Sequence, residues 1–433
     1  MTGEGRGRMR RHTAVLLAGQ IGRIALQGLY FVVLARTLGA AHYGASAAVL
    51  ALVSMLLPFS SLGTILLLVR NVAQQPATAA VQWANCVTLV LVSGTTLAVL
   101  LALAGRWVAP AATSVAVIAA VGITDLVLAR VTEAAGAVFH AQEHMHWSAL
   151  VPVLLQAARL LGLAALVLGP WTVDLTSWAV SYAVSTALVC LALTVLVLRR
   201  LGWSPPQLAR YRQEWRTGLL FSVGMASTTV YNDVDKAMLG RFATLEATGI
   251  YSAAYRVVDM SYAPVRSLLG AASPAMWRAG ADGSVTAVAA VARARLLRPA
   301  AAYCLLGTVG MFGAADLVPA LLGDSFTESV PALRALSFLL IVKGCHYVIG
   351  DTLTCAGAQG ARTVVQVAVA VLNVGLCLLL IPTHGWQGAV LVSLVCDGLL
   401  AVGLGAILAH RLRRERSRPA PTTVDYAGTT AAS

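Results

Sequence analysis

The sequence predicts an all-α integral membrane protein with about twelve transmembrane helices in two six-helix bundles, related by a parallel pseudo-twofold repeat. The 433-residue chain is 58% hydrophobic and only 11% charged, whereas a soluble globular chain has about 25% charged residues. Its apolar residues fall in runs of about 20, the length that spans a bilayer as a helix. Basic residues gather in the connections between these runs, as orientation signals do in membrane proteins.

Twelve apolar runs have the length of a membrane span. Their approximate bounds are 14–36, 43–67, 80–104, 109–129, 148–169, 175–198, 216–238, 246–270, 299–322, 331–355, 361–382 and 386–409. Two runs depart most from a plain apolar span. Pro58 and Gly63 interrupt the second, and the tenth carries Arg334, Lys343 and Asp351.

The charges of the connections test this number of spans, because arginine and lysine accumulate on the cytoplasmic side of a membrane. With twelve spans, only Arg36, Arg106 and Arg241 fall on one side. The opposite side takes the N-terminal arginines, Arg70, Arg130, Arg199, Arg200, Arg210, Arg212, Arg216, Arg278, Arg293, Arg295, Arg298, Arg362 and the arginines from Arg411 to Arg418. Both termini are therefore expected in the cytoplasm.

The basic connection 199–215 divides the chain into two sets of six spans. A basic cytoplasmic N-terminus, 1–13, precedes the first bundle at 14–198, and the second bundle occupies 216–410. The remaining segment, 411–433, ends in residues rich in Pro, Thr, Ala and Ser. Such a composition predicts a disordered cytoplasmic tail.

The two sets of spans share a short repeated pattern. LAR at 34–36 recurs as LGR at 239–241, and Gly44 matches Gly249, each at an offset of 205 residues. Because both sets begin on the same side, this pattern indicates a parallel repeat about an axis along the membrane normal. In transporters of this design the ligand site lies between the halves near the bilayer midplane, and the halves rock against each other.

The stretch 231–260 places acidic and basic side chains between two long apolar runs. An ionised side chain within a span costs about 2.5 to 3.5 kcal/mol on insertion scales, so it usually faces a hydrated cavity or a partner of opposite charge. Asp233 and Lys236 are three residues apart, as are Arg256 and Asp259. Each pair therefore meets on one helix face. Mutual neutralisation and a polar, ligand-facing cavity both account for this arrangement.

Three segments carry a family resemblance: LARTLGAAHYG at 34–44, DKAMLGRFATLEATGIYSAAYR at 235–256 and LLLIPTHGWQGAV at 378–390. They resemble the polysaccharide transporter and O-antigen flippase branch of the multidrug/oligosaccharidyl-lipid/polysaccharide flippase superfamily. The resemblance extends from the first run to the twelfth. It implies two six-helix bundles in the cytoplasmic membrane of a bacterium. It also implies movement of an undecaprenyl-diphosphate-linked glycan, an exopolysaccharide or O-antigen-like precursor, by a carrier that is not an enzyme.

The sister family of lipid II flippases is similar in architecture and holds the diphosphate with cavity arginines on its first and eighth helices. Arg23 and Arg256 occupy comparable positions in this sequence. The sister family also has two extra C-terminal helices, and their absence from this sequence disfavours lipid II as the cargo.

Four basic residues lie away from the ends of their predicted spans and are the candidates for binding the substrate: Arg23, Arg256, Arg159 and Lys343. Arginine suits a diphosphate because its planar fork binds two oxygens at once and its charge persists at cellular pH. The alternative for each residue is an ion pair or hydrogen bond to a neighbouring helix.

Six further charged residues are candidates for a gate or for coupling to an ion gradient: Asp233, Asp235, Lys236, Asp259, Asp351 and Asp397. Asp235 and Lys236 lie close to the outer end of the seventh span and form either a gate or a structural pair. Asp351 and Asp397 are candidates to carry protons, but aspartates within spans also cap helices and pair with cations.

No cofactor or metal is expected. His140, Glu143 and His144 have the H-x-x-E-H spacing of an inverted zinc-protease motif, but no further carboxylate ligand is evident nearby. The seven cysteines lie in apolar runs without C-x-x-C spacing, which favours packing over metal binding. The sequence has no G-x-x-x-x-G-K-[ST] loop, so direct use of ATP is not expected.

The function expected first is a flippase for a lipid-linked oligosaccharide, with membrane lipids around it and glycosyltransferases and a polysaccharide polymerase as partners. The alternative is a cation-coupled multidrug or metabolite exporter, which would favour acidic cavity walls. A membrane scaffold for glycan assembly is a third candidate. The net charge of +13 does not indicate a nucleic-acid partner, because the basic residues lie between apolar runs rather than on a soluble domain.

Overall fold

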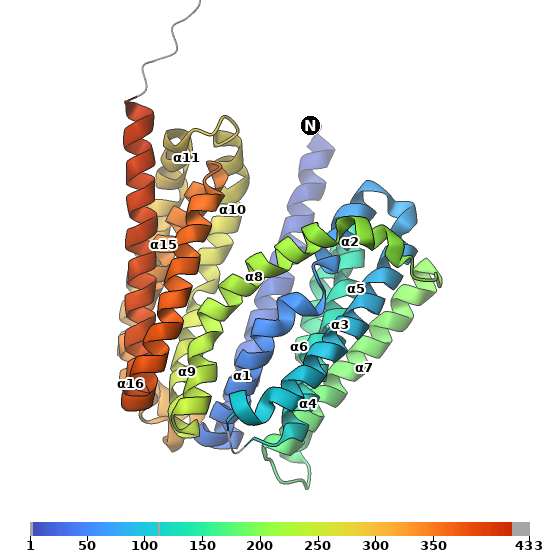
Figure 1. Ribbon diagram of the computed structural model, residues 1–433, viewed down its shortest axis with the longest axis vertical. Helices are drawn as coiled ribbons and strands as arrows, with labels where there is room; N and C mark the ends of the chain where they lie inside the picture. The colour runs from blue at the N-terminus through green and yellow to red at the C-terminus, as the bar shows by residue number, and fades with distance from the viewer. Residues whose placement is uncertain (1–2, 111–112, 418–433) are drawn as a thin grey trace, which may run out of the picture. The chain divides into compact units, whose positions relative to one another are not determined.

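The computed structural model describes residues 3–110 and 113–417, which form helices and no strand (Figure 1). The prediction of an all-α protein is therefore confirmed. The elements in order are α1 (Gly3–Ser60), α2 (Thr64–Gln74), η1 (Pro76–Thr78), α3 (Ala79–Val108), α4 (Val115–Ile123), η2 (Thr124–Leu128), α5 (Ala129–Ala141), α6 (Met145–Leu168), α7 (Leu175–Leu201), α8 (Leu208–Phe242), α9 (Leu245–Ser261), α10 (Ala263–Ala279), α11 (Val285–Ala292), η3 (Arg293–Leu297), α12 (Arg298–Ala314), α13 (Leu317–Leu322), η4 (Asp324–Phe326), α14 (Ser329–Leu336), α15 (Leu339–Cys355) and α16 (Gln359–Arg416).

Eight segments of the described chain are long and apolar enough to cross a membrane. Two of them, Val15–Ser60 and Gln359–Arg416, bend at single glycines with non-helical backbone, Gly39 (φ 69°) and Gly385 (φ 53°). Each of these segments therefore contains two spans. The charged helix α8 and the pair α9 and α10 lie outside the eight and account for the predicted seventh and eighth spans. The described helices thus match the twelve predicted runs.

Several helix ends differ from the apolar runs. The second predicted span, 43–67, ends at Ser60, because the chain turns through Leu62 (φ 47°) and Gly63 (φ 73°) before α2. The fourth, 109–129, continues as helix to Ala141. The ninth, 299–322, is shifted, since its helix already begins at Val285 and ends at Ala314. In the ninth segment, the exposed arginines Arg293, Arg295 and Arg298 lie within the helix, so hydropathy alone gives the wrong bounds.

The predicted connections are shorter than expected. Within 199–215, only residues 202–207 lie between α7 and α8. The N-terminal segment 1–13 is helical from Gly3. The predicted tail 411–433 is helical to Arg416 in α16, and its residues 418–433 lie outside the described residues.

Packing divides the chain into two compact units. Unit 1 contains the residues up to Met260 together with Gly310–Ser337 and Ala370–Ser393, and unit 2 contains Ser261–Val309, Phe338–Val369 and the residues from Leu394 onward. A core of buried side chains in unit 1 joins α2, α3, α5 and α7 and includes Leu68, Trp83, Val138, Phe139 and Val197. This core fixes the first-half helices that surround the site described below.

A close crossing of α1 and α9 in unit 1 joins the two copies of the predicted repeat. A Cβ atom on Gly44 would lie 1.9 Å from the carbonyl oxygen of Leu245, and one on Gly249 would lie 1.9 Å from that of Ala40. Ala40 and Gly44 precede Leu245 and Gly249 by the same 205 residues. The two halves of the chain therefore meet here through equivalent positions.

The repeat-related arginines Arg36 and Arg241 make a second pair of contacts. Arg36 Nη1 donates to the carbonyl oxygens of Ala320 (3.2 Å) and Leu321 (3.4 Å). Arg241 Nε donates to the carbonyl oxygen of Trp107 (2.9 Å). Each arginine follows the repeated Leu34 or Leu239 in the sequence and binds the backbone of a helix from the other half. The two arginines thus make similar backbone contacts, although the carbonyl groups that they bind are not related by the 205-residue offset.

We predict that Gly44→Ala and Gly249→Ala each destabilise the folded protein by about 1–3 kcal/mol, because the new methyl group overlaps a backbone carbonyl and forces the helices apart. Thermal unfolding in detergent, followed by tryptophan fluorescence, measures the change. Gly224→Ala in α8 is the matched control, since its Cβ meets no atom within 4 Å. Equal unfolding temperatures for all three variants would contradict the close crossing.

Candidate functional site

A cavity of about 610 Å³ lies within unit 1 among α1, α2, η2, α5 and α6. Its charged lining residues are Arg23, Arg130 and Arg159 against Asp125 and Glu133, with His140 also at the wall. The described lining thus carries more arginines than carboxylates. The size falls within the range of about 300–1,000 Å³ that is usual for ligand pockets.

Arg159 of α6 is held by Asp125 and Thr186. Arg159 Nη2 donates to Asp125 Oδ1 at 2.9 Å, and Nε donates to Thr186 Oγ1 at 3.0 Å. Asp125 belongs to η2, a π-helical turn between α4 and α5. Such turns are frequent at functional sites, since the extra residue redirects a side chain.

Aromatic side chains surround this ion pair. The hydroxyl of Tyr182 donates to both oxygens of Asp125 (2.9 and 3.1 Å), and the guanidinium of Arg159 lies 4.1 Å from the centre of the Tyr182 ring. Trp178 stacks on Tyr182 and donates its indole N–H to the hydroxyl of Tyr30 at 2.8 Å. This network fixes the position and direction of the Arg159 charge.

Tyr30 joins α1 to the network around Arg159. It lies two helical turns from Arg23, and its hydroxyl accepts from Trp178, which stacks on the Tyr182 ring that Arg159 contacts. Met260, one turn after Arg256, packs against α1 at Gly28. Arg23 therefore shares its cavity with Arg159 of α6, whereas α9 packs against α1 at Gly28, two residues from Tyr30 and on another face of the helix.

Lys236 of α8 forms an ion pair with Asp233, as the three-residue spacing predicted. The Nζ–Oδ1 distance is 2.6 Å, and Ser54 of α1 donates to the other carboxylate oxygen at 2.8 Å. The ammonium group also lies 4.3 Å from the centre of the Tyr255 ring and within electrostatic range of Asp259. These contacts tie α8 to α1 and α9.

Asp235 has different partners from those of Lys236. Its side chain is 2% exposed and accepts hydrogen bonds from Tyr251 of α9 and from Ser393 of α16 (3.4 Å). Tyr251 and Ser393 are also hydrogen bonded to each other at 2.7 Å. The side-chain ion pair at this point is therefore Asp233–Lys236. Lys236 donates its backbone N–H to Asp235, at 2.7 Å, and the other hydrogen bonds of Asp235 form a buried polar cluster.

The remaining candidates lie in unit 2. Lys343 of α15 is 3% exposed, and His346, one turn later, binds Asp397 of α16 at 3.0 Å. Asp351 pairs with Arg362 at 3.0 Å. The structure thus gives both predicted proton carriers a partner, a histidine for Asp397 and an arginine for Asp351.

Several residues that contact the predicted cations and acids were missed by sequence reasoning. Asp125, Tyr30, Tyr182 and His346 were not predicted as site residues, although they hold or face predicted ones. Asp125 carried a usable signal, because it is a carboxylate within an apolar run. The tyrosines carried none, since their neighbours come from distant segments of the chain.

The His140–His144 segment ends α5 and begins α6. His140 lies 3.4 Å from the hydroxyl of Ser148, and the ring of His144 packs against that of His146. Among residues 3–110 and 113–417, no three His, Cys, Asp or Glu side chains are arranged to hold a metal ion.

A family profile described as polysaccharide biosynthesis protein matches residues 9–279. The chain belongs to the polysaccharide biosynthesis protein family. The match covers the complete first half and the α8–α10 region, so it includes Arg23, Arg159, Lys236 and Arg256. No curated protein sequence matches this family member.

Solved structures show which fold this polysaccharide biosynthesis protein has. An inward-facing multidrug resistance MATE family transporter of the MOP superfamily is similar over 92% of this chain and 96% of its own, with 14% identity and a TM-score of 0.73. The lipid II flippase MurJ in an inward closed conformation is similar over 92% of this chain and 87% of its own, with 10% identity and a TM-score of 0.70. A MOP superfamily transporter from Pyrococcus furiosus, with a binding pocket of reversed polarity, is similar over 94% of this chain and 96% of its own. Its identity is 14% and the TM-score is 0.60. The fold is therefore that of the MOP superfamily.

We predict that Arg159→Met alone destabilises the protein by about 1–3 kcal/mol, because it leaves the half-buried Asp125 carboxylate without its cation. Asp125→Asn combined with Arg159→Met should recover part of that loss, since neither charge then remains. A double-mutant cycle on unfolding in detergent measures the coupling. Strictly additive losses would contradict a direct ion pair.

Proposed function

We propose that this protein is a flippase that moves a polyprenyl-diphosphate-linked oligosaccharide across the cytoplasmic membrane by alternating access, for cell-surface polysaccharide synthesis. The family and the fold support a membrane carrier of this general kind. The observation that carries the substrate class is the positive face of the larger cavity, which Arg23, Arg130 and Arg159 line; we add Arg256 of α9 as a further phosphate-binding candidate.

The chemistry of the cargo requires such a face. A diphosphate and a polar glycan cannot cross about 30 Å of hydrocarbon without a hydrated path. Arginine binds phosphate oxygens through a planar fork and stays charged. Arg23 and Arg159 share one cavity wall with Asp125, so the cavity provides both cations and hydrogen-bond partners for water. The polyprenyl chain needs no protein groups, because it remains in the lipid.

We assign the gate and coupling roles to the paired acids. Asp233–Lys236 joins α8 to α1 through Ser54, so this pair must rearrange if the two helices separate during transport. Asp235 with Tyr251 and Ser393, and Asp397 with His346, are buried carboxylates with polar neighbours. Buried carboxylates of this kind are the usual proton or cation carriers in transporters.

The same proposal includes location and partners. The protein would lie in the plasma membrane of a bacterium with both termini cytoplasmic, beside glycosyltransferases and a polysaccharide polymerase. A drug exporter for organic cations is disfavoured, because the described charged residues of the cavity wall carry an excess of arginine. Lys343 remains a candidate substrate residue through its burial in α15.

We predict that Arg256→Ala abolishes complementation of a bacterial strain that lacks its own polysaccharide flippase, because a phosphate-binding charge is lost. Arg256→Lys should restore part of the activity, since it returns the charge without the bidentate fork. Surface polysaccharide is measured by immunoblotting, and membrane insertion by the amount of protein in the membrane fraction.

Arg278→Ala is the matched control, because Arg278 is an exposed arginine of α10 at the end of its helix. It should complement as the wild type does. Full complementation by Arg256→Ala would remove Arg256 from the proposed site. Failure of the inserted wild-type protein to complement strains for several different glycans would overturn the proposed function itself.

A further inference from the structure

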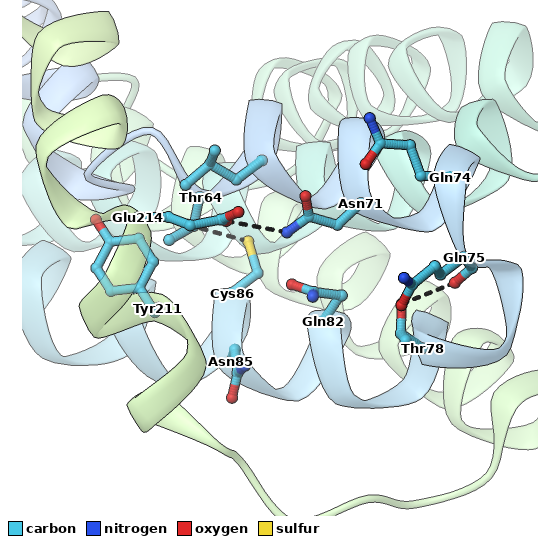
Figure 2. A pocket seen from close by; sticks show the side chains of 11 residues that line it. Thr64, Asn71, Gln74, Gln75, Thr78, Gln82, Asn85, Cys86, Tyr211 and Glu214 are labelled. Atoms are coloured by element: carbon cyan, nitrogen blue, oxygen red, sulfur yellow. Dashed lines mark hydrogen bonds between the residues drawn. The ribbon is translucent and has the colours of Figure 1, made fainter.

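A second cavity, of about 320 Å³, lies in unit 1 between α2, η1, α3 and the beginning of α8 (Figure 2). Its described lining residues are mostly uncharged and polar: Thr64, Leu67, Asn71, Gln74, Gln75, Thr78, Gln82, Asn85, Cys86, Tyr211 and Glu214. It shares no described lining residue with the arginine-lined cavity. We call it the amide pocket.

The charge of the amide pocket is already neutralised. Glu214 is the one acidic side chain among its described lining residues. Arg70 Nη2 donates to Glu214 Oε1, and Asn71 Nδ2 donates to Oε2 at 3.1 Å. Because no arginine or lysine is among the described lining residues, the pocket favours neither an anion nor a free cation.

Three glutamine amides are available to a ligand. The side chains of Gln74, Gln75 and Gln82 line the pocket and make no hydrogen bond to other described residues. Each amide offers two N–H donors and one oxygen acceptor. Figure 2 shows Gln82 on α3 beside Asn71 on α2, with their amides between the two helices. Neutral donors and acceptors are thus presented together from neighbouring helices.

The wall formed by the 199–215 connection is held rigidly. Tyr211 donates its hydroxyl to the carbonyl oxygen of Leu62 at 2.7 Å. Asn85 donates to the carbonyl oxygen of Gln207 at 3.2 Å and accepts from its backbone N–H. An aromatic ring is therefore fixed at one side of a set of amides. Because this wall is already ordered, ligand binding costs little conformational entropy of the protein.

We propose that the amide pocket binds a neutral sugar unit. Sugar hydroxyls are both donors and acceptors, as the glutamine amides are, and the apolar face of a sugar ring packs on an aromatic side chain such as Tyr211. The volume of about 320 Å³ is near the lower limit of about 300 Å³ for ligand pockets, which suits one small ring rather than a lipid chain. The sugar has two possible sources, the carried glycan and a free saccharide. The first of these rests on the proposed function.

Binding of simple sugars to the full chain tests the proposal directly. The protein is placed in nanodiscs of phosphatidylethanolamine and phosphatidylglycerol, and saturation-transfer difference NMR is recorded with methyl glycosides of glucose, galactose, rhamnose and N-acetylglucosamine. We expect at least one to bind. Gln74→Ala and Gln82→Ala should each weaken that binding about fivefold, as expected for the loss of one hydrogen bond. Gln142→Ala, a partly exposed glutamine outside the pocket, should bind as the wild type does.

Other results overturn the sugar site. These are binding of none of the four glycosides, an equal affinity in all variants, or displacement of the sugar by millimolar inorganic phosphate, which would indicate an anion site. Unfolding temperatures measured in the same nanodiscs, with Gln142→Ala as the reference, separate a loss of sugar binding from a loss of folding.

A second arm identifies the source of the sugar. A lipid-linked oligosaccharide with a photoreactive sugar should crosslink to peptides from 64–86 in the wild type and not in the Gln74→Ala/Gln82→Ala variant. Crosslinking supports the carried glycan as the ligand, whereas glycoside binding without crosslinking supports a free saccharide. Sugar binding in a protein that fails to complement any flippase-deficient strain would retain the amide pocket and reject the flippase proposal.

Discussion

The cost of an ionised side chain inside a bilayer governs this structure. Each such group needs a partner or water, at a cost of about 2.5–3.5 kcal/mol if it has neither. The helices meet this constraint with pairs that link different segments: Arg159 with Asp125, Lys236 with Asp233, and Asp397 with His346. The Asp125 pair holds Arg159 of α6 in the cavity that Arg23 of α1 and Arg130 of α5 also line.

The internal repeat supplies the geometry for that arrangement. The glycine crossing lets α1 and α9 approach until their backbones touch, and the repeat-related arginines bind backbone carbonyls of the opposite half. A parallel repeat makes such contacts in pairs. It also explains why α8 can carry three charged residues within a span, since its partners are contributed by α1, α9 and α16.

The sequence predicted an all-α membrane protein because apolar runs and basic connections are local properties. It also predicted the Asp233–Lys236 pair, which lies within one helix. The helix bounds at Ala141 and Val285 were missed, because the helices include charged residues beyond the apolar run: Arg130 and Glu133 before Ala141, and Arg293, Arg295 and Arg298 after Val285. The partners of Asp235 could not be predicted, since Tyr251 and Ser393 approach it only through the packing of α9 and α16. The amide pocket likewise needs α2, α3 and the first turns of α8 together.

The central claim is that the arginine-bearing side of α1 receives a diphosphate headgroup. Native mass spectrometry of the purified protein with equal amounts of undecaprenyl diphosphate and undecaprenol tests it most directly, because the two lipids differ only in the headgroup. We expect the wild type to retain the diphosphate lipid in clear preference to the alcohol, and Arg23→Ala to lose most of that preference. Equal retention of both lipids by the wild type would contradict the account.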